Sequence, residues 1–292
     1  MRTILLGLVA TVTCLLPAAD EPVSAARAIL DQQGGAVVHA ILTVKQPVFR
    51  GRGGAGGGRD AAPADPAAPA ETRDREIEVP ATVIDAAGLA VFPTEALDGF
   101  AGRMRRMLPG GVGEVRMSVA GSGGGEVSAA ALVLADGTRL EAEVTQRDET
   151  VGLGLLKLKA PPAKPLASLA PPTAPPTLRL LDPVVVIGRC DSELGRAPRL
   201  LLGHIQAVTE KPKGGWLLTL ADTEGLVGCP AFTLDGTPLG ILCDRAPGER
   251  RGRVCWIMPD IQVRDLAARP KAAPAVAPQP ATPPPPPGAP GF

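Results

Sequence analysis

Short apolar segments with strand-like alternation recur along the first half of the chain, separated by turn residues. Polar and apolar positions alternate, and β-branched residues are frequent, as half-buried strands require. Asp85–Gly88 and Asp136-Gly137 are turn sequences between neighbouring segments. The strand candidates are Val37–Val44, 78–84, Leu89–Phe92, Val115–Val119, Ala129–Leu134, Leu140–Val144 and Leu153–Leu158.

A second series of the same kind follows a proline-rich link at 161–176, and Asp235-Gly236 turns one of its hairpins. Its strand candidates are Val184–Ile187, Leu200–Val208, Trp216–Leu220, Ala231–Leu234, Leu239–Cys243 and Val254–Met258. Short helices are predicted at Thr94–Leu108, capped by Thr94, and at Asp260–Ala267. Two such halves predict an all-β protein made of sandwiches or barrels.

Two segments are too poor in large apolar residues to pack. Residues 50–75 run through RGRGGAGGG and an Ala/Pro-rich stretch, and 269–292 form a Pro/Ala-rich tail with five consecutive prolines at 283–287. We expect a disordered loop and a disordered, partly polyproline II tail. The Arg-Gly stretch also has the composition of an RNA-binding segment, but in an exported chain we interpret it as a flexible loop.

The N-terminus has the pattern of a signal peptide. A basic start at Arg2 precedes the apolar run Ile4–Leu16, and small residues offer cleavage between 19 and 26. A lipoprotein reading through Cys14 fits less well. We therefore expect residues 1–19 to be removed and the domain, residues 27–268, to be exported to the periplasm, cell envelope or outside. No other segment is apolar enough to span a membrane.

Charge and cysteine content narrow the function further. The formal net charge is +0 at pH 7, so nothing indicates nucleic acid as a partner. Cys190, Cys229, Cys243 and Cys255 remain after export, and four cysteines allow three disulfide connectivities. The sequence holds no CxxC pair or Cys/His cluster, and its only histidines are His39 and His204. We expect no metal and no cofactor.

Five local sequences, in the same order, resemble the Deg/HtrA group of trypsin-like serine proteases. They are DAAGLAVFPTEAL at 85–97, ADGT at 135–138 with DETVGLGLLKL at 148–158, VVIG at 185–188, GLVGCP at 225–230 with LDGTPLGI at 234–241, and WIMP at 256–259. The resemblance implies a chymotrypsin-like double β-barrel. The first barrel should span about 36–160 and the second about 178–268. It also implies that the PDZ module common in that group is missing.

The catalytic positions of that group fall on residues without catalytic chemistry. The histidine position falls on Glu95, the aspartate position on Gly152 and the serine position on Val227. A triad needs a hydroxyl nucleophile, an imidazole base and a carboxylate to orient it. Cys229 falls on a loop glycine, and we expect its side chain to point away from the nucleophile site. The resemblance therefore indicates a pseudoprotease.

The resemblance leaves a binding role open. Gly225, Leu226, Val227 and Gly228 form a vestigial oxyanion loop whose amides can still accept an anion. Extended peptides or envelope proteins are the expected partners, bound by strand addition beside the old site. A cleft closed by Leu226, Val227 and Cys229, leaving only a scaffold, is equally consistent with the sequence. The loop at 50–75 falls where relatives carry a regulatory loop.

The same placement of the segments predicts which cysteines form disulfides. The expected hairpin brings Cys243 opposite Cys255, and the resemblance puts Cys190 and Cys229 in neighbouring loops. We therefore predict Cys190–Cys229 and Cys243–Cys255 disulfides.

Two alternatives remain. One is an active serine endopeptidase of envelope quality control whose motifs are misregistered, using Ser118, Ser122, Ser128 or Ser192, although none of these lies in a Gly-x-Ser-Gly context. The other is a structural envelope protein. The oligomeric state stays undetermined.

Overall fold

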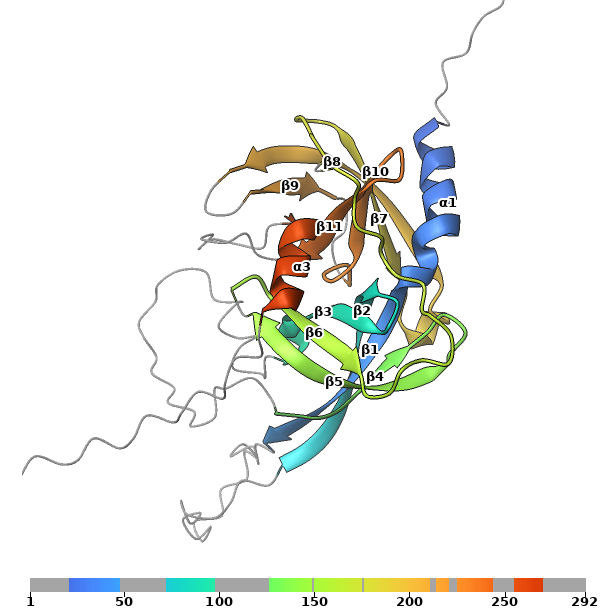
Figure 1. Ribbon diagram of the computed structural model, residues 1–292, viewed down its shortest axis with the longest axis vertical. Coiled ribbons are helices and arrows are strands. Elements are labelled where there is room, and N and C mark those ends of the chain that lie inside the picture. The colour runs from blue at the N-terminus through green and yellow to red at the C-terminus, as the bar shows by residue number, and fades with distance from the viewer. Residues whose placement is uncertain are drawn as a thin grey trace, which may run out of the picture.

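Two closed six-stranded antiparallel barrels make up the protein, as Figure 1 shows. The computed structural model describes residues 21–47, 72–97, 126–148, 150–174, 176–210, 214–220, 225–243 and 255–269. The first barrel consists of β1 (Val37–Pro47), β2 (Thr72–Asp85), β3 (Leu89–Pro93), β4 (Glu126–Val133), β5 (Arg139–Asp148) and β6 (Leu153–Leu158). The second consists of β7 (Pro183–Arg189), β8 (Pro198–Thr209), β9 (Gly215–Thr219), β10 (Pro230–Thr233), β11 (Pro238–Cys243) and β12 (Trp256–Pro259). The predicted all-β, chymotrypsin-like double barrel is confirmed.

Alternation along β1 explains how the first barrel closes. Val38, Ala40, Leu42 and Val44 point to one face and are buried in the barrel interior with Phe92. Residues two apart on a strand share a face, so these four positions give a continuous apolar stripe. The barrel closes in the order β1-β2-β3-β6-β5-β4.

A separate apolar core joins the two barrels. Val37 at the start of β1, Ile84 in β2 and Val151 before β6 are buried in one cluster with residues of the second barrel, including Phe232 and Trp256. Because this cluster takes side chains from both barrels, the barrels pack as a single body. Polar groups buried at this junction need hydrogen-bond partners.

One helix lies at each end of the described chain. Helix α1 (Glu21–Gln33) packs against β7 and β8 of the second barrel through Ala26 and Ile29, which are both buried. Nothing in the sequence had predicted it. Helix α3 (Asp260–Ala268) follows β12 and packs against β11, in agreement with the predicted closing helix. No helix of the described segments is long and apolar enough to cross a membrane.

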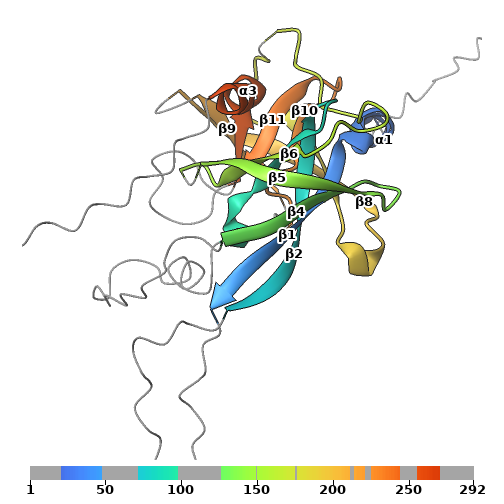
Figure 2. The same ribbon diagram turned by 60° about the horizontal axis from the view of Figure 1, so that its bottom comes forward.

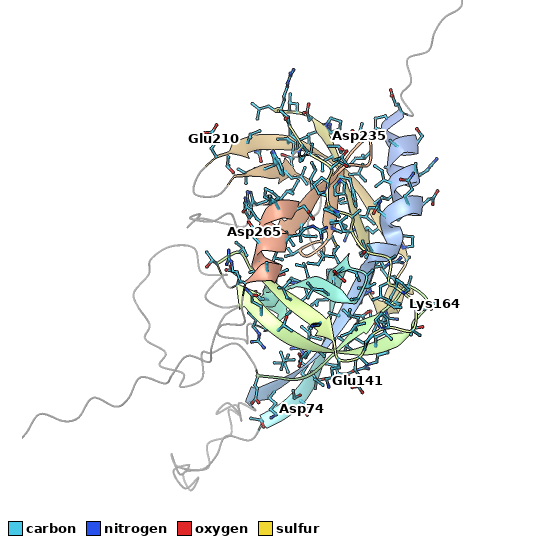
Figure 3. The ribbon with its side chains drawn as sticks, viewed as in Figure 1. Asp74, Glu141, Lys164, Glu210, Asp235 and Asp265 are labelled. Carbon is cyan, nitrogen blue, oxygen red and sulfur yellow. The ribbon has the colours of Figure 1, made fainter. Side chains whose placement is uncertain are left out.

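One sequence-based boundary is corrected. Residues 72–75, assigned above to a disordered loop, belong to β2 and pair with Val44–Pro47 of β1. Their side chains are exposed, so the segment lacks an apolar signal although its backbone is paired. Figures 1 and 2 show β1 and β2 continuing beyond the barrel as a two-stranded ribbon, with Asp74 near its far end in Figure 3.

The predicted helix at 94–108 begins as a short 3₁₀ helix, Thr94–Leu97. Its remainder lies outside the described residues. The signal peptide, the strand at Val115–Val119, the loop up to residue 71 and the proline-rich tail also lie outside them.

Candidate functional site

The segment that the resemblance assigns to the nucleophile forms a tight turn. The N–H of Cys229 donates to the carbonyl of Leu226 at 3.0 Å, which closes a four-residue turn with Val227 in its second position. Gly228 in the third position has φ +90°, as a type II turn requires and as glycine readily adopts. The turn expected from the sequence is therefore present, and Val227 lies at the position that the resemblance assigns to the nucleophile.

This turn is fixed to the first barrel. The hydroxyl of Thr82 on β2 donates a buried 2.6 Å hydrogen bond to the carbonyl oxygen of Gly228. A Cβ atom at Gly228 would lie 2.9 Å from Cδ of Pro93 and 3.2 Å from the carbonyl oxygen of Pro80, so only glycine fits there. The serine position thus lies at the junction of the barrels.

The other two triad positions meet at the same junction. The N–H of Thr94, the residue before Glu95, donates to the carbonyl of Gly152 at 2.9 Å. Gly152 itself has φ +74° and closes a turn by donating to the carbonyl of Asp148. Pro93, two residues before Glu95, pairs with Leu153 next to Gly152 and lies against Gly228 next to Val227, so the three segments meet around Pro93.

The residues brought together cannot form a charge-relay triad. Val227 has no nucleophilic atom, and Gly152 has no side chain to orient a base. Glu95 is half-buried and can accept a proton, but no hydroxyl occupies the serine position beside it. His39 lies in β1 and His204 in β8, so neither occupies the turn where an imidazole would be needed.

Cys229 does not replace the missing serine. Its side chain is fully buried, and its sulfur would lie 3.5 Å from a Cβ atom at Gly188 of β7. The side chain therefore points into the second barrel; the sequence had predicted only that it would point away from the nucleophile position. Burial raises the pKa of the Cys229 thiol to about 12, which keeps it protonated and unreactive at neutral pH.

Two backbone N–H groups in and beside the proposed oxyanion loop already donate hydrogen bonds within the protein. The N–H of Gly228 donates to the carbonyl of Leu242 at 2.8 Å, and the N–H of Cys229 closes the turn. The side chain of Leu226 is buried over Gly188, where a Cβ atom would lie 2.7 Å from its Cδ2. Gly225 is exposed with φ +69°. An anion at this loop would have to use the amides from Gly225 to Val227.

Neither of the two predicted disulfides is formed among the described residues. The register of the β11–β12 hairpin puts Cys243 opposite Trp256 and not opposite Cys255. Neighbouring residues of a strand point to opposite faces, so this one-residue offset separates the two sulfurs. Cys229 is turned into the barrel core, away from a bridge across the surface to Cys190.

The serines of the alternative protease reading lie elsewhere. Ser128 is an exposed residue of β4 that donates to the carbonyl of Thr43, and Ser192 lies in a short 3₁₀ helix after β7. Ser118 and Ser122 lie outside the described residues. Within the described segments, no group of three or more His, Cys, Asp or Glu side chains is arranged to hold a metal ion.

Comparison with known families agrees with this geometry. The family model of the trypsin-like peptidase domain matches residues 116–241, which run from before β4 into β11 and include the turn at Val227. A search of curated proteins gives no match. The family match and the two closed six-stranded barrels together support a trypsin-like protease-family protein.

Proposed function

We propose that this protein is an exported pseudoprotease: a trypsin-like domain without peptidase activity that binds extended polypeptide beside its degenerate site. The observation that carries the proposal is Val227, which occupies the nucleophile position of a turn that is otherwise preserved and bonded to the first barrel. The turn is hydrogen-bonded within itself and to the first barrel, although Glu95, Gly152 and Val227 cannot form a triad. That pattern favours a retained binding architecture over a decayed enzyme.

The binding surface is the open edge of β2. This strand pairs with β1 from Thr72 to Thr82 and with β3 only from Thr82 onward. Among the described residues, no strand covers its other edge between Thr72 and Ala81. The carbonyl oxygen of Pro80 is directed from this edge toward Gly228, so the open edge leads away from the turn. An extended peptide can add to such an edge through main-chain hydrogen bonds.

The first test is for peptidase activity, which should be absent. Purified protein beginning at Glu21 should neither hydrolyse casein nor react with a fluorophosphonate probe, because Val227 offers no oxygen nucleophile. Trypsin run in parallel is the positive control. Stoichiometric phosphonate labelling would refute the pseudoprotease proposal and restore the serine endopeptidase reading.

Binding is tested with an unfolded polypeptide, reduced and carboxymethylated casein, by fluorescence anisotropy. Residues two apart on a strand direct their backbone groups to the same edge, so the N–H of Glu76 shares the open edge with Pro80. Glu76→Pro removes that donor while leaving the pairing with β1, and it should abolish binding. Glu76→Ala is the matched control and should bind normally. Absence of binding by the unchanged protein would favour a structural scaffold instead.

Export is tested separately. The mature protein should be recovered from the envelope or medium, and its N-terminus should fall near Glu21, where α1 begins. A cut as late as residue 26 would remove the first turns of α1, so we expect cleavage at the early end of the 19–26 interval. An uncleaved cytoplasmic protein would contradict the proposal.

A further inference from the structure

A buried histidine lies at the junction of the barrels, away from the degenerate triad. His39 on β1 is 2% exposed, and its Nδ1 atom has no hydrogen-bond partner. The nearest carboxylate is that of Glu78 on β2, with Oε1 at 3.8 Å from Nδ1, which is too far for a hydrogen bond. A buried polar atom that close to a carboxylate but unbonded to it calls for an explanation.

The same Glu78 oxygen holds a loop of the second barrel. Nε of Arg196 donates to Oε1 of Glu78 at 2.8 Å, across 118 positions of sequence. Arg196 belongs to the loop at 190–197, which connects β7 to β8. Its backbone has φ +55°, a conformation that non-glycine residues adopt only at a cost in free energy. The ion pair therefore holds a strained loop against the first barrel.

Arg189 completes the junction. Its guanidinium donates to the carbonyl oxygens of Val37 at 2.6 Å, Gly34 at 2.9 Å and Arg196 at 3.3 Å. These bonds tie the end of β7 to the start of β1 and to the loop itself. The loop is thus held by one carboxylate and by backbone carbonyls, and the carboxylate is the contact for which a protonated His39 would compete directly.

We propose that His39 and Glu78 form an acid-sensitive latch, which holds the 190–197 loop on the first barrel at neutral pH and releases it on acidification. At neutral pH His39 is uncharged and Glu78 binds Arg196. When His39 takes up a proton, two cations compete for one carboxylate oxygen, and the new charge repels Arg196. Release also relieves the positive φ of Arg196.

The charges around His39 favour release of the 190–197 loop when His39 is protonated. The groups that face it are Glu78 on β2, Arg189 on β7, and Asp191 and Arg196 in the loop. Its strand neighbours, Pro80 and Val133, are uncharged. Burial is the largest cause, and together with the two arginines it outweighs the opposing effect of Glu78 and Asp191, so the pKa of His39 lies below its usual value of about 6.5. Opening the loop removes part of that burial, so the open form binds the proton more tightly.

The latch adjoins the degenerate site at two points. Glu78 is two residues from Pro80, whose carbonyl is directed toward Gly228. Gly188, just before Arg189, packs against Leu226 of the turn. Release of the loop therefore changes the surroundings of the turn and of the open β2 edge. The inference rests on the geometry of the latch and stands whether or not the proposed peptide binding is correct.

Two measurements on the same protein test the latch. The only histidines are His39 and His204, so ¹H–¹⁵N NMR resolves the two imidazole titrations. Hydrogen–deuterium exchange reports the protection of residues 191–197, after correction for the intrinsic pH dependence of exchange. Below pH 6.5 the opening of this loop should increase by up to about tenfold per pH unit, until the His39 imidazole is protonated in the closed form. Protection elsewhere in the β7–β8 hairpin should not change.

Matched variants test whether the pH-dependent loss of loop protection depends on His39. His39→Gln cannot take up the proton, and it should keep the loop protected at low pH. His204→Gln, at an exposed position of β8, should respond like the unchanged protein. Glu78→Gln should leave the loop unprotected at every pH. A loop whose protection does not follow the His39 titration would overturn the proposal, and so would a loss of protection across the whole barrel. Neither outcome requires that His39→Gln folds.

Discussion

The hydroxyl of Thr82 donates to the carbonyl oxygen of Gly228 at 2.6 Å, across 146 positions of sequence. Thr82 is fully buried, so water cannot replace the lost bond if the hydroxyl is removed. The bond joins β2 of the first barrel to the turn that carries Val227. Because it links a strand of one barrel to a turn of the other, we expect it to help hold the two barrels together.

Thr82→Val tests that role with nearly unchanged shape. The substitution leaves the Gly228 carbonyl buried without its donor, which should lower the free energy of unfolding by about 1–3 kcal/mol. Thr219→Val on β9 is the control, because Thr219 is exposed, and its effect should stay within about 0.5 kcal/mol. Chemical denaturation at neutral pH measures both. Equal effects of the two substitutions would mean that the bond contributes nothing specific.

The strands could be predicted from sequence because their signal is local. The segments Leu153–Leu158 and Leu239–Cys243 have apolar residues and flanking turns that fix their limits, and the structure agrees closely. The beginning of β2 has no such signal, since Thr72–Glu76 is charged and exposed and is a strand only through its pairing with β1. Helix α1 shows only two buried positions, too few to stand out as an amphipathic pattern.

The candidate site was likewise only partly predictable from the sequence. Motif order placed Glu95, Gly152 and Val227, because the turns around them depend on nearby glycines and prolines. The His39–Glu78–Arg196 junction had no sequence signal, because its members come from three distant segments and look like ordinary strand and loop residues. The predicted Cys243–Cys255 disulfide depends on the exact register of the hairpin, which its long connection leaves open; the structure pairs Cys243 with Trp256.

Arg264 on α3 is predicted to be a second clamp between the barrels. Its guanidinium donates to Asp260 at 2.7 Å and to the carbonyls of Leu169 at 2.8 Å and Ile84 at 3.2 Å. Asp260 is 3% exposed, so Arg264→Met leaves a buried carboxylate unpaired. The expected loss is about 2–3 kcal/mol, below the roughly 3–5 kcal/mol of fully buried pairs, because Arg264 remains 32% exposed.

The matched control is Arg269→Met, at the end of the same helix. Arg269 is 48% exposed and lies 3.4 Å from Asp148, so its loss should cost less than about 1 kcal/mol. Adding Asp260→Asn to Arg264→Met should recover part of the stability, because it removes the unpaired charge. No recovery would mean that the two backbone contacts, and not the carboxylate, account for the effect.

His39 should make the protein less stable in mild acid. Its folded-state pKa is lowered, chiefly by burial, so the unfolded chain takes up a proton at a pH where the folded protein resists it. The free energy of unfolding should therefore fall as pH drops through about 6.5, and level off below the folded pKa. Urea denaturation from pH 8 to pH 5 measures this slope. His39→Gln should flatten it and His204→Gln should not; a slope unchanged in His39→Gln would assign it to other groups.

Thiol reactivity should separate the four cysteines. Cys229 and Cys243 are buried, and burial raises the pKa of Cys255, like that of Cys229, to about 12. The thiolate is the reactive form, so iodoacetamide at pH 7.5 should modify half-buried Cys190 first in the folded protein beginning at Glu21. Unfolding without a reducing agent should then make all four react, as mass spectrometry of the peptides would show. Cys190→Ser should abolish the fast reaction alone. Fast labelling of Cys229 would reveal an open, reactive thiol beside the old nucleophile position, and a cysteine that reacts only after reduction would reveal a disulfide.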